Sequence, residues 1–141
     1  HVSPETMDDA IRVSASPGIF SDSSPRALCD VPRKVPDDIL REVAANGGVV
    51  MVTFIPEFVS AKRAAWGKGM ETLIQGAKTG DEMARIEADY TKANGPAPPA
   101  TLAQVADHVE HVARVAGHDH VGVPDAGGER GKGRNLNPPY A

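Results

Sequence analysis

The first clear structural signal in this sequence is VPDDILREVAANGGVVMVTFI, residues 35–55. Its acidic pair, Asp37 and Asp38, suits the first turn of a helix because negative charge there favours the helix dipole. Asn46 and Gly47 predict the end of that helix, since both tolerate the left-handed conformation. The apolar run that follows, residues 49–55, predicts a strand, and its continuous hydrophobicity is typical of a parallel strand covered on both faces. The buried face of the helix is predicted to consist of Ile39, Leu40, Val43 and Ala44.

The same helix-then-strand pattern occurs on both sides of this stretch. Before it, Ser3 and Pro4 predict a helix start, and a strand is expected from Ile19. After it, Thr101 and Gln104 form a capping-box pattern ahead of an apolar face at Leu102, Val105, Val109 and Val112. Gly117 should end this third helix, and residues 120–123 should form the next strand. Repeated units of this kind predict an α/β fold with a parallel sheet.

Two segments interrupt or leave this pattern. Residues 56–100 form an insertion with two expected helices divided near Thr79, and a Pro-rich linker, residues 94–99, leads back to the sheet. Such an insertion could be a lid over a substrate pocket or a surface addition, and the periodicity favours neither. Residues 126–141 lack an apolar period, so an irregular or disordered tail is expected after a domain that spans residues 1–125.

Composition excludes several classes of protein. Hydrophobic residues make up 40% of the 141 residues and charged residues 24%, which is typical of a globular domain. The net charge of −4 and the scattered Lys and Arg residues argue against nucleic-acid binding. The single cysteine, Cys29, excludes an internal disulfide framework. The chain begins with His1 rather than Met, so the sequence leaves its compartment, any export signal and any membrane association open.

Several motifs resemble the membrane dipeptidase (renal dipeptidase) family in the same order along the chain. They lie at residues 1–7, 19–24, 26–29, 33–38, 46–52, 100–109, 115–117 and 120–122. The resemblance extends from His1 to about Val123 and is loosest in the insertion.

This resemblance implies the C-terminal half of a (β/α)8 TIM-type barrel with two zinc ions at the carboxyl ends of its strands. A complete barrel of this type has eight strands and about 250 residues, whereas three helix–strand units are evident here. The implied activity is hydrolysis of the peptide bond of dipeptides by a water that both metals activate, and the complete protein could be a homodimer. A fragment of this size should be inactive alone.

Two residues are candidates for metal ligands. His1 falls where the family has a zinc-binding histidine, and neutral imidazole is a good zinc ligand. Asp22 falls where the family has a second histidine ligand, within a Phe-Ser-His-Ser pattern. A carboxylate can also bind zinc, but Asp22 could equally cap a loop, with metal binding lost.

Two further residues are candidates for contact with the substrate. Arg33 aligns with the family arginine that binds the free carboxylate of the substrate, a task that suits the two-pronged guanidinium. Asp125 is the catalytic candidate: the family has an aspartate after its last strand, but without a gap that position falls on Ala126 here.

Other residues that could carry chemistry are interpreted as structural. His108 and His111 lie on the third helix, outside the expected barrel, and Cys29 is expected to be a buried apolar residue. A second function also stays open, that of a non-catalytic homologue that binds a ligand or partner. Asp22 and the altered segment around Asp125 favour this alternative.

Overall fold

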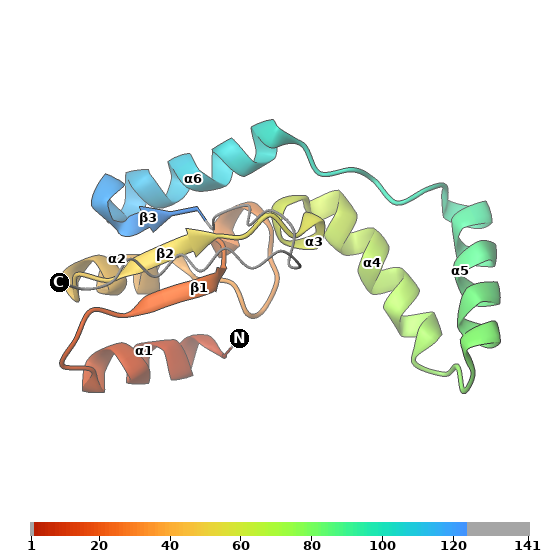
Figure 1. The fold of residues 1–141 in the computed structure, drawn as a ribbon, viewed down its shortest axis with the longest axis horizontal. Helices are drawn as coiled ribbons and strands as arrows, with labels where there is room; N and C mark the ends of the chain where they lie inside the picture. Colours follow the sequence, from red (N-terminus) through yellow and green to blue (C-terminus); the bar gives the residue numbers. More distant parts are fainter. Residues whose placement is uncertain (1, 124–141) are drawn as a thin grey trace, which may run out of the picture.

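Three parallel strands with helices beside them form the body of the protein (Figure 1). The structure is a computed structural model and describes residues 2–123. The sheet has the order β1-β2-β3, with β1 at Ile19–Ser23, β2 at Val49–Val52 and β3 at Val121–Gly122. The predicted α/β fold with a parallel sheet is confirmed.

Each strand follows a helix, as the sequence predicts. Helix α1 (Pro4–Val13) precedes β1, α2 (Asp37–Ala45) precedes β2, and α6 (Leu102–Ala116) precedes β3. The Ser3 side chain caps α1, and Thr101 and Gln104 form both hydrogen bonds of the predicted capping box at α6. Gly47 and Gly117 adopt positive φ angles of 76° and 101°, which explains why glycine stands after α2 and α6.

The core lies between the sheet and these helices. Leu40 and Val43 of α2, Val50 and Val52 of β2, and Val112 of α6 are fully buried in one cluster. In Figure 1, α1 lies beside β1, α6 lies beside β3, and α2 covers the sheet from behind. Among the described helices, none combines the length and apolar character needed to cross a bilayer.

The insertion contains three helices rather than the expected two. Strand β2 ends at Val52 instead of Ile55, and a short helix α3 (Pro56–Val59) follows it directly. Helices α4 (Ala61–Ile74) and α5 (Gly80–Asn94) then form a hairpin that extends away from the sheet (Figure 1). The expected strand was too long because Phe54 and Ile55, although apolar, are exposed where the chain turns into α3.

Two smaller expectations at the third unit were wrong. Leu102 is 84% exposed rather than part of the buried face of α6, because it lies in the first turn, beyond the part of the helix that packs on the core. His120 belongs to a short 3-10 helix, η2 (His118–His120), and its Nδ1 lies 2.7 Å from Gly48 O.

Candidate functional site

The loop between β1 and α2 turns back on its own start at the carboxyl end of the sheet. Arg26 N donates to Val35 O at 2.8 Å, and Val35 N donates to Ser24 O at 3.0 Å. Val35 is fully buried in the core cluster, which anchors the returning end of the loop. Because Arg33 lies two residues before this anchor, its position is determined by a closed loop rather than by a free surface segment.

Arg33 is also held by an aromatic ring from the insertion. Its Cζ atom lies 4.3 Å from the centroid of the Phe58 ring, within the range of a cation–π contact. Phe58 belongs to α3 and is buried. A guanidinium in contact with an aromatic ring can still bind a carboxylate through its N–H groups.

A cavity of about 520 Å³ lies between α1 and β1, along the length of the strand. Asp22, Ser23 and Arg33 are among the residues that line it, together with residues of α1 and β1 that include Met7 and Phe20. Two of the predicted site residues, Asp22 and Arg33, are therefore brought to one cavity from different segments. The Ser23 side chain is buried, and its Oγ has no hydrogen-bond partner within residues 2–123.

The other two predicted site residues, His1 and Asp125, lie outside the described residues. Within the described part of the chain, no group of three or more His, Cys, Asp or Glu side chains could hold a metal ion. Asp22 offers carboxylate oxygens at the end of β1, a donor type that zinc accepts. Among the described residues, Asp22 is therefore the one predicted metal ligand, and its role as a ligand stays a prediction.

Beneath Arg33, three buried side chains contact successive carbonyl groups of α3. Cys29 Sγ donates to Glu57 O at 3.4 Å, Lys34 Nζ donates to Phe58 O at 2.7 Å, and His108 Nε2 lies 3.1 Å from Val59 O. We call these three residues, Cys29, Lys34 and His108, the α3 clamp. Carbonyl groups near the end of a helix lack partners within the helix, so side chains that reach them stabilise the end of α3.

The charges in the α3 clamp respond to burial. Burial lowers the pKa of Lys34 to about 8, whereas the nearby Cys29 and Asp30 act in the opposite direction. Burial, and then the neighbouring Lys34 charge, lower the pKa of His108. A neutral His108 must carry its proton on Nε2, because the carbonyl of Val59 can only accept.

The sequence interpretation missed Lys34 as a buried group because lysine is almost always exposed. The local sequence around Lys34 did not indicate its burial, because its hydrogen-bond partner, the carbonyl of Phe58, lies 24 residues later in the chain. The structural interpretation of Cys29, His108 and His111 is confirmed. All three are buried, and His111 Nε2 lies 2.8 Å from Asp37 Oδ1 across the α2–α6 contact.

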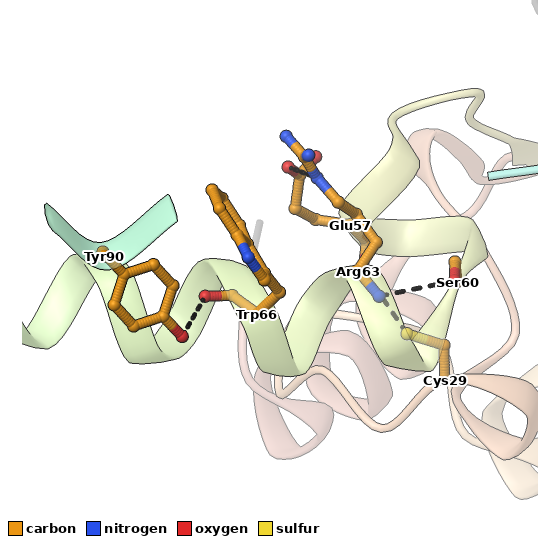
Figure 2. Close-up of polar contacts among 6 residues, drawn as sticks. All are labelled: Cys29, Glu57, Ser60, Arg63, Trp66 and Tyr90. Carbon is orange, nitrogen blue, oxygen red and sulfur yellow. Dashed lines mark hydrogen bonds and ion pairs between the residues drawn. The ribbon is translucent and has the colours of Figure 1, made fainter. Parts of the chain in front are cut away.

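The insertion has its own polar contacts where it leaves the sheet (Figure 2). Arg63 Nε donates to Glu57 Oε1 at 2.7 Å, which joins α4 to α3. Further along, Tyr90 of α5 donates its hydroxyl to Trp66 O of α4 at 3.1 Å, and the two rings meet edge to face. These contacts fix the start of α4 relative to the α3 clamp, and a role of the hairpin as a lid stays a prediction.

Comparison with known proteins gives a consistent picture. The family model described as Membrane dipeptidase (Peptidase family M19) matches residues 1–132. An uncharacterized dipeptidase of Schizosaccharomyces pombe is 34% identical over 123 residues, which is 87% of this chain and 22% of that protein. A second uncharacterized dipeptidase of the same organism is 52% identical over 60 residues, 43% of this chain and 15% of that protein.

Solved structures share the fold at lower sequence identity. The probable dipeptidase PvdM from Pseudomonas aeruginosa matches with a TM-score of 0.63 and 21% identity, over 86% of this chain and 36% of that one. A metallopeptidase described as dipeptidase AC matches with a TM-score of 0.58 and 19% identity, over 87% of this chain and 28% of that one. The chain thus spans about a fifth of the longer-matching curated relative and about a third of these structures.

Proposed function

Because the chain belongs to the membrane dipeptidase family, peptidase family M19, we propose that it is part of a metal-dependent dipeptidase. The single observation that carries this proposal is the cavity between α1 and β1, which Asp22 and Arg33 both line. In parallel α/β folds, ligands bind at the carboxyl ends of the strands, so the part of the cavity beside Asp22 and Ser23 lies where a substrate site is expected. The substrate would be a dipeptide, and the family membership supports this class.

Arg33 is proposed to bind the free carboxylate of the dipeptide. Arg33 lines the cavity and its guanidinium lies over the Phe58 ring, so its position would be set before the substrate binds. A bidentate contact with a carboxylate requires such a planar, fixed group. Binding the carboxylate in this way would place the peptide bond at a constant distance from Arg33, which favours short substrates.

The metal ions are proposed to bind at a site that is complete only in the whole enzyme and to which this chain contributes some of the ligands. Zinc, two ions in the complete enzyme, would supply a water nucleophile whose pKa is lowered by coordination. His1 and Asp22 are the proposed ligands from this chain, and Asp125 is the proposed catalytic acid–base group. Within residues 2–123, no group of three or more His, Cys, Asp or Glu side chains could hold a metal ion, so the other ligands would come from outside these residues.

The partial barrel is likewise a proposal. Three parallel strands, each preceded by a helix, agree with one segment of a (β/α)8 barrel, and the structures that share the fold are much longer than this chain. A complete barrel would bring further strand ends, with further ligands, around the same cavity.

A non-catalytic homologue is the second candidate. Asp22 replaces the expected histidine ligand with a negatively charged and shorter side chain, and this favours loss of the metal. Such a protein would keep the cavity and Arg33, and would bind a carboxylate ligand without hydrolysing it.

The test compares two substrates that differ only at the carboxylate, Gly-Leu and Gly-Leu amide. We expect the protein expressed from the full open reading frame that encodes this chain to prefer Gly-Leu, and Arg33→Ala to lower kcat/KM for Gly-Leu by about 10- to 1,000-fold. Hydrolysis of the amide should change little. Binding of Gly-Leu without turnover would support the non-catalytic homologue, and an unchanged preference in Arg33→Ala would remove the proposed role of Arg33.

A further inference from the structure

Lys34 is fully buried, which is unusual for lysine and needs a reason. Its ammonium group reaches Phe58 O at 2.7 Å, at the end of the four-residue helix α3. A positive charge near the carboxyl end of a helix is favourable, but the cost of removing that charge from water is larger in general. A residue that serves packing alone would be better replaced by an apolar side chain of the same length.

A continuous series of contacts leads from Lys34 to the cavity. Lys34 holds the Phe58 backbone, and the ring of the same Phe58 lies under the guanidinium of Arg33 at 4.3 Å. Arg33 in turn lines the cavity of about 520 Å³. The adjacent residues Arg33 and Lys34 thus contact the same phenylalanine, Arg33 at its ring and Lys34 at its backbone carbonyl.

The other members of the α3 clamp support the same arrangement. Cys29 and His108 contact the carbonyl groups just before and just after that of Phe58. Together the three side chains leave the backbone of α3 little freedom to rotate. The ring under Arg33 is therefore held by the backbone and by its own burial, with 5% of Phe58 exposed.

We propose that Lys34 is a positioning residue for Arg33: by fixing the Phe58 carbonyl, it fixes the ring on which the carboxylate-binding guanidinium stacks. This inference rests on the proposed function, because the position of Arg33 matters only if Arg33 binds the substrate. It assigns to the insertion a part in the site, since α3 supplies the platform. The specificity for a free carboxylate then depends on a residue that never touches the substrate.

The first arm of the test measures the geometry without any activity. Because the Arg33 guanidinium lies 4.3 Å from the Phe58 ring centroid, the side-chain NMR signals of Arg33 in the 141-residue chain should carry a ring-current shift from that ring. Phe58→Leu removes that shift, and Lys34→Met, which keeps the apolar stem, should move the same signals toward the Phe58→Leu values. Phe58→Tyr keeps the ring and should preserve the shift, and Lys68→Met, at an exposed lysine of α4, should leave it unchanged. Unchanged Arg33 signals in Lys34→Met would overturn the inference.

The second arm measures specificity in the protein from the full open reading frame. Phe58→Leu and Lys34→Met should each lower kcat/KM for Gly-Leu by about 2- to 30-fold, the range of a cation–π contact, and leave that for Gly-Leu amide unchanged. Phe58→Tyr should retain the preference of the wild type. A loss that is equal for both substrates would mean a merely structural role and would overturn the inference.

The two proposals fail in different ways. If Arg33→Ala lowers the preference for Gly-Leu but Lys34→Met and Phe58→Leu do not, the positioning role is wrong and the proposed function stands. If Arg33→Ala itself leaves the preference unchanged, the proposed role of Arg33 is wrong, whatever the NMR signals show.

Discussion

Asp22, the next-to-last residue of β1, lines the cavity at the position where the family resemblance implies a neutral histidine ligand. A carboxylate and an imidazole both bind zinc, but they differ in charge and reach. If Asp22 is a ligand, Asp22→His should restore the expected donor and raise zinc affinity by about tenfold or more. Zinc content after dialysis against a graded chelator series would measure this.

A matched control for this substitution lies on the insertion. Asp81 is exposed in the first turn of α5, so Asp81→His adds an imidazole away from the cavity and should leave zinc content unchanged. Equal zinc content in wild type and Asp22→His would show that Asp22 is not in the coordination shell.

The buried Lys34 should make the free energy of unfolding depend on pH in the alkaline range. Burial lowers its pKa from 10.5 to about 8, so between these values the unfolded chain binds more protons at this residue than the folded chain does. Stability therefore rises with pH across this window, and Lys34 contributes up to about 3 kcal/mol of that rise. Below pH 8 the full cost of the buried charge is present.

Lys34→Met should remove this contribution. Urea unfolding at several pH values between 8 and 10.5 should give a flatter dependence for Lys34→Met than for the wild type. Lys68→Met, which removes an exposed lysine, should keep the wild-type slope. Parallel curves for wild type and Lys34→Met would contradict the burial of a titrating Lys34.

At the scale of elements, the register of β1 and β2 depends on a close approach at Gly48. A Cβ atom there would collide with the backbone carbonyl oxygen of Gly18 and would crowd the Val43 side chain. The same Gly18 carbonyl accepts from Val49 N at 2.9 Å at the start of the parallel pair, so it cannot move freely. Gly48→Ala should destabilise the protein by about 1–3 kcal/mol.

Gly80 provides the comparison, because a Cβ atom there would meet nothing within 4 Å. Gly80→Ala, at the start of α5, should be neutral or stabilise by up to about 1 kcal/mol. Thermal unfolding of both variants measures the difference, and an equal effect at the two positions would count against the close approach of β1 and β2.

The elements themselves were largely predictable, for local reasons. Ser3, Thr101 and the glycines at 47 and 117 act through hydrogen bonds and backbone angles within a few residues, so the sequence reveals them directly. Helix α3 was missed because its four residues carry no period, and its end is stabilised by side chains from distant segments. Apolar Phe54 and Ile55 looked like strand residues because hydrophobicity alone does not show where a chain turns.

At the scale of the whole molecule, the repeated helix–strand units predicted the topology of the sheet. The sequence predicted only some of the residues of the candidate site. Asp22 and Arg33 were predicted through the family resemblance, and the structure brings them to one cavity. The contact between Arg33 and Phe58 could not be predicted, because it joins the β1–α2 loop to helix α3 through tertiary packing. The hydrogen bond from Lys34 to the Phe58 carbonyl could not be predicted for the same reason, and because lysine side chains are seldom buried.

The described part of the sheet also has apolar surface at the β3 edge. A groove of about 850 Å³ lies between α6 and β3, lined by residues such as Phe54, Leu102 and Val109. An exposed apolar groove beside an edge strand agrees with the proposal that further strands and helices of a barrel pack there. The site then needs groups from those further elements.

The most direct test of this account is hydrolysis of Gly-Leu by two preparations, the purified 141-residue chain and the protein from the full open reading frame. Because the chain covers 22% of one dipeptidase relative and 36% of one solved structure that it matches, the proposed metal site would need groups from the rest of a barrel, and the 141-residue chain should show no hydrolysis. The full product should hydrolyse Gly-Leu, and a chelator should stop it. Chelator-sensitive hydrolysis by the 141-residue chain alone would contradict the account.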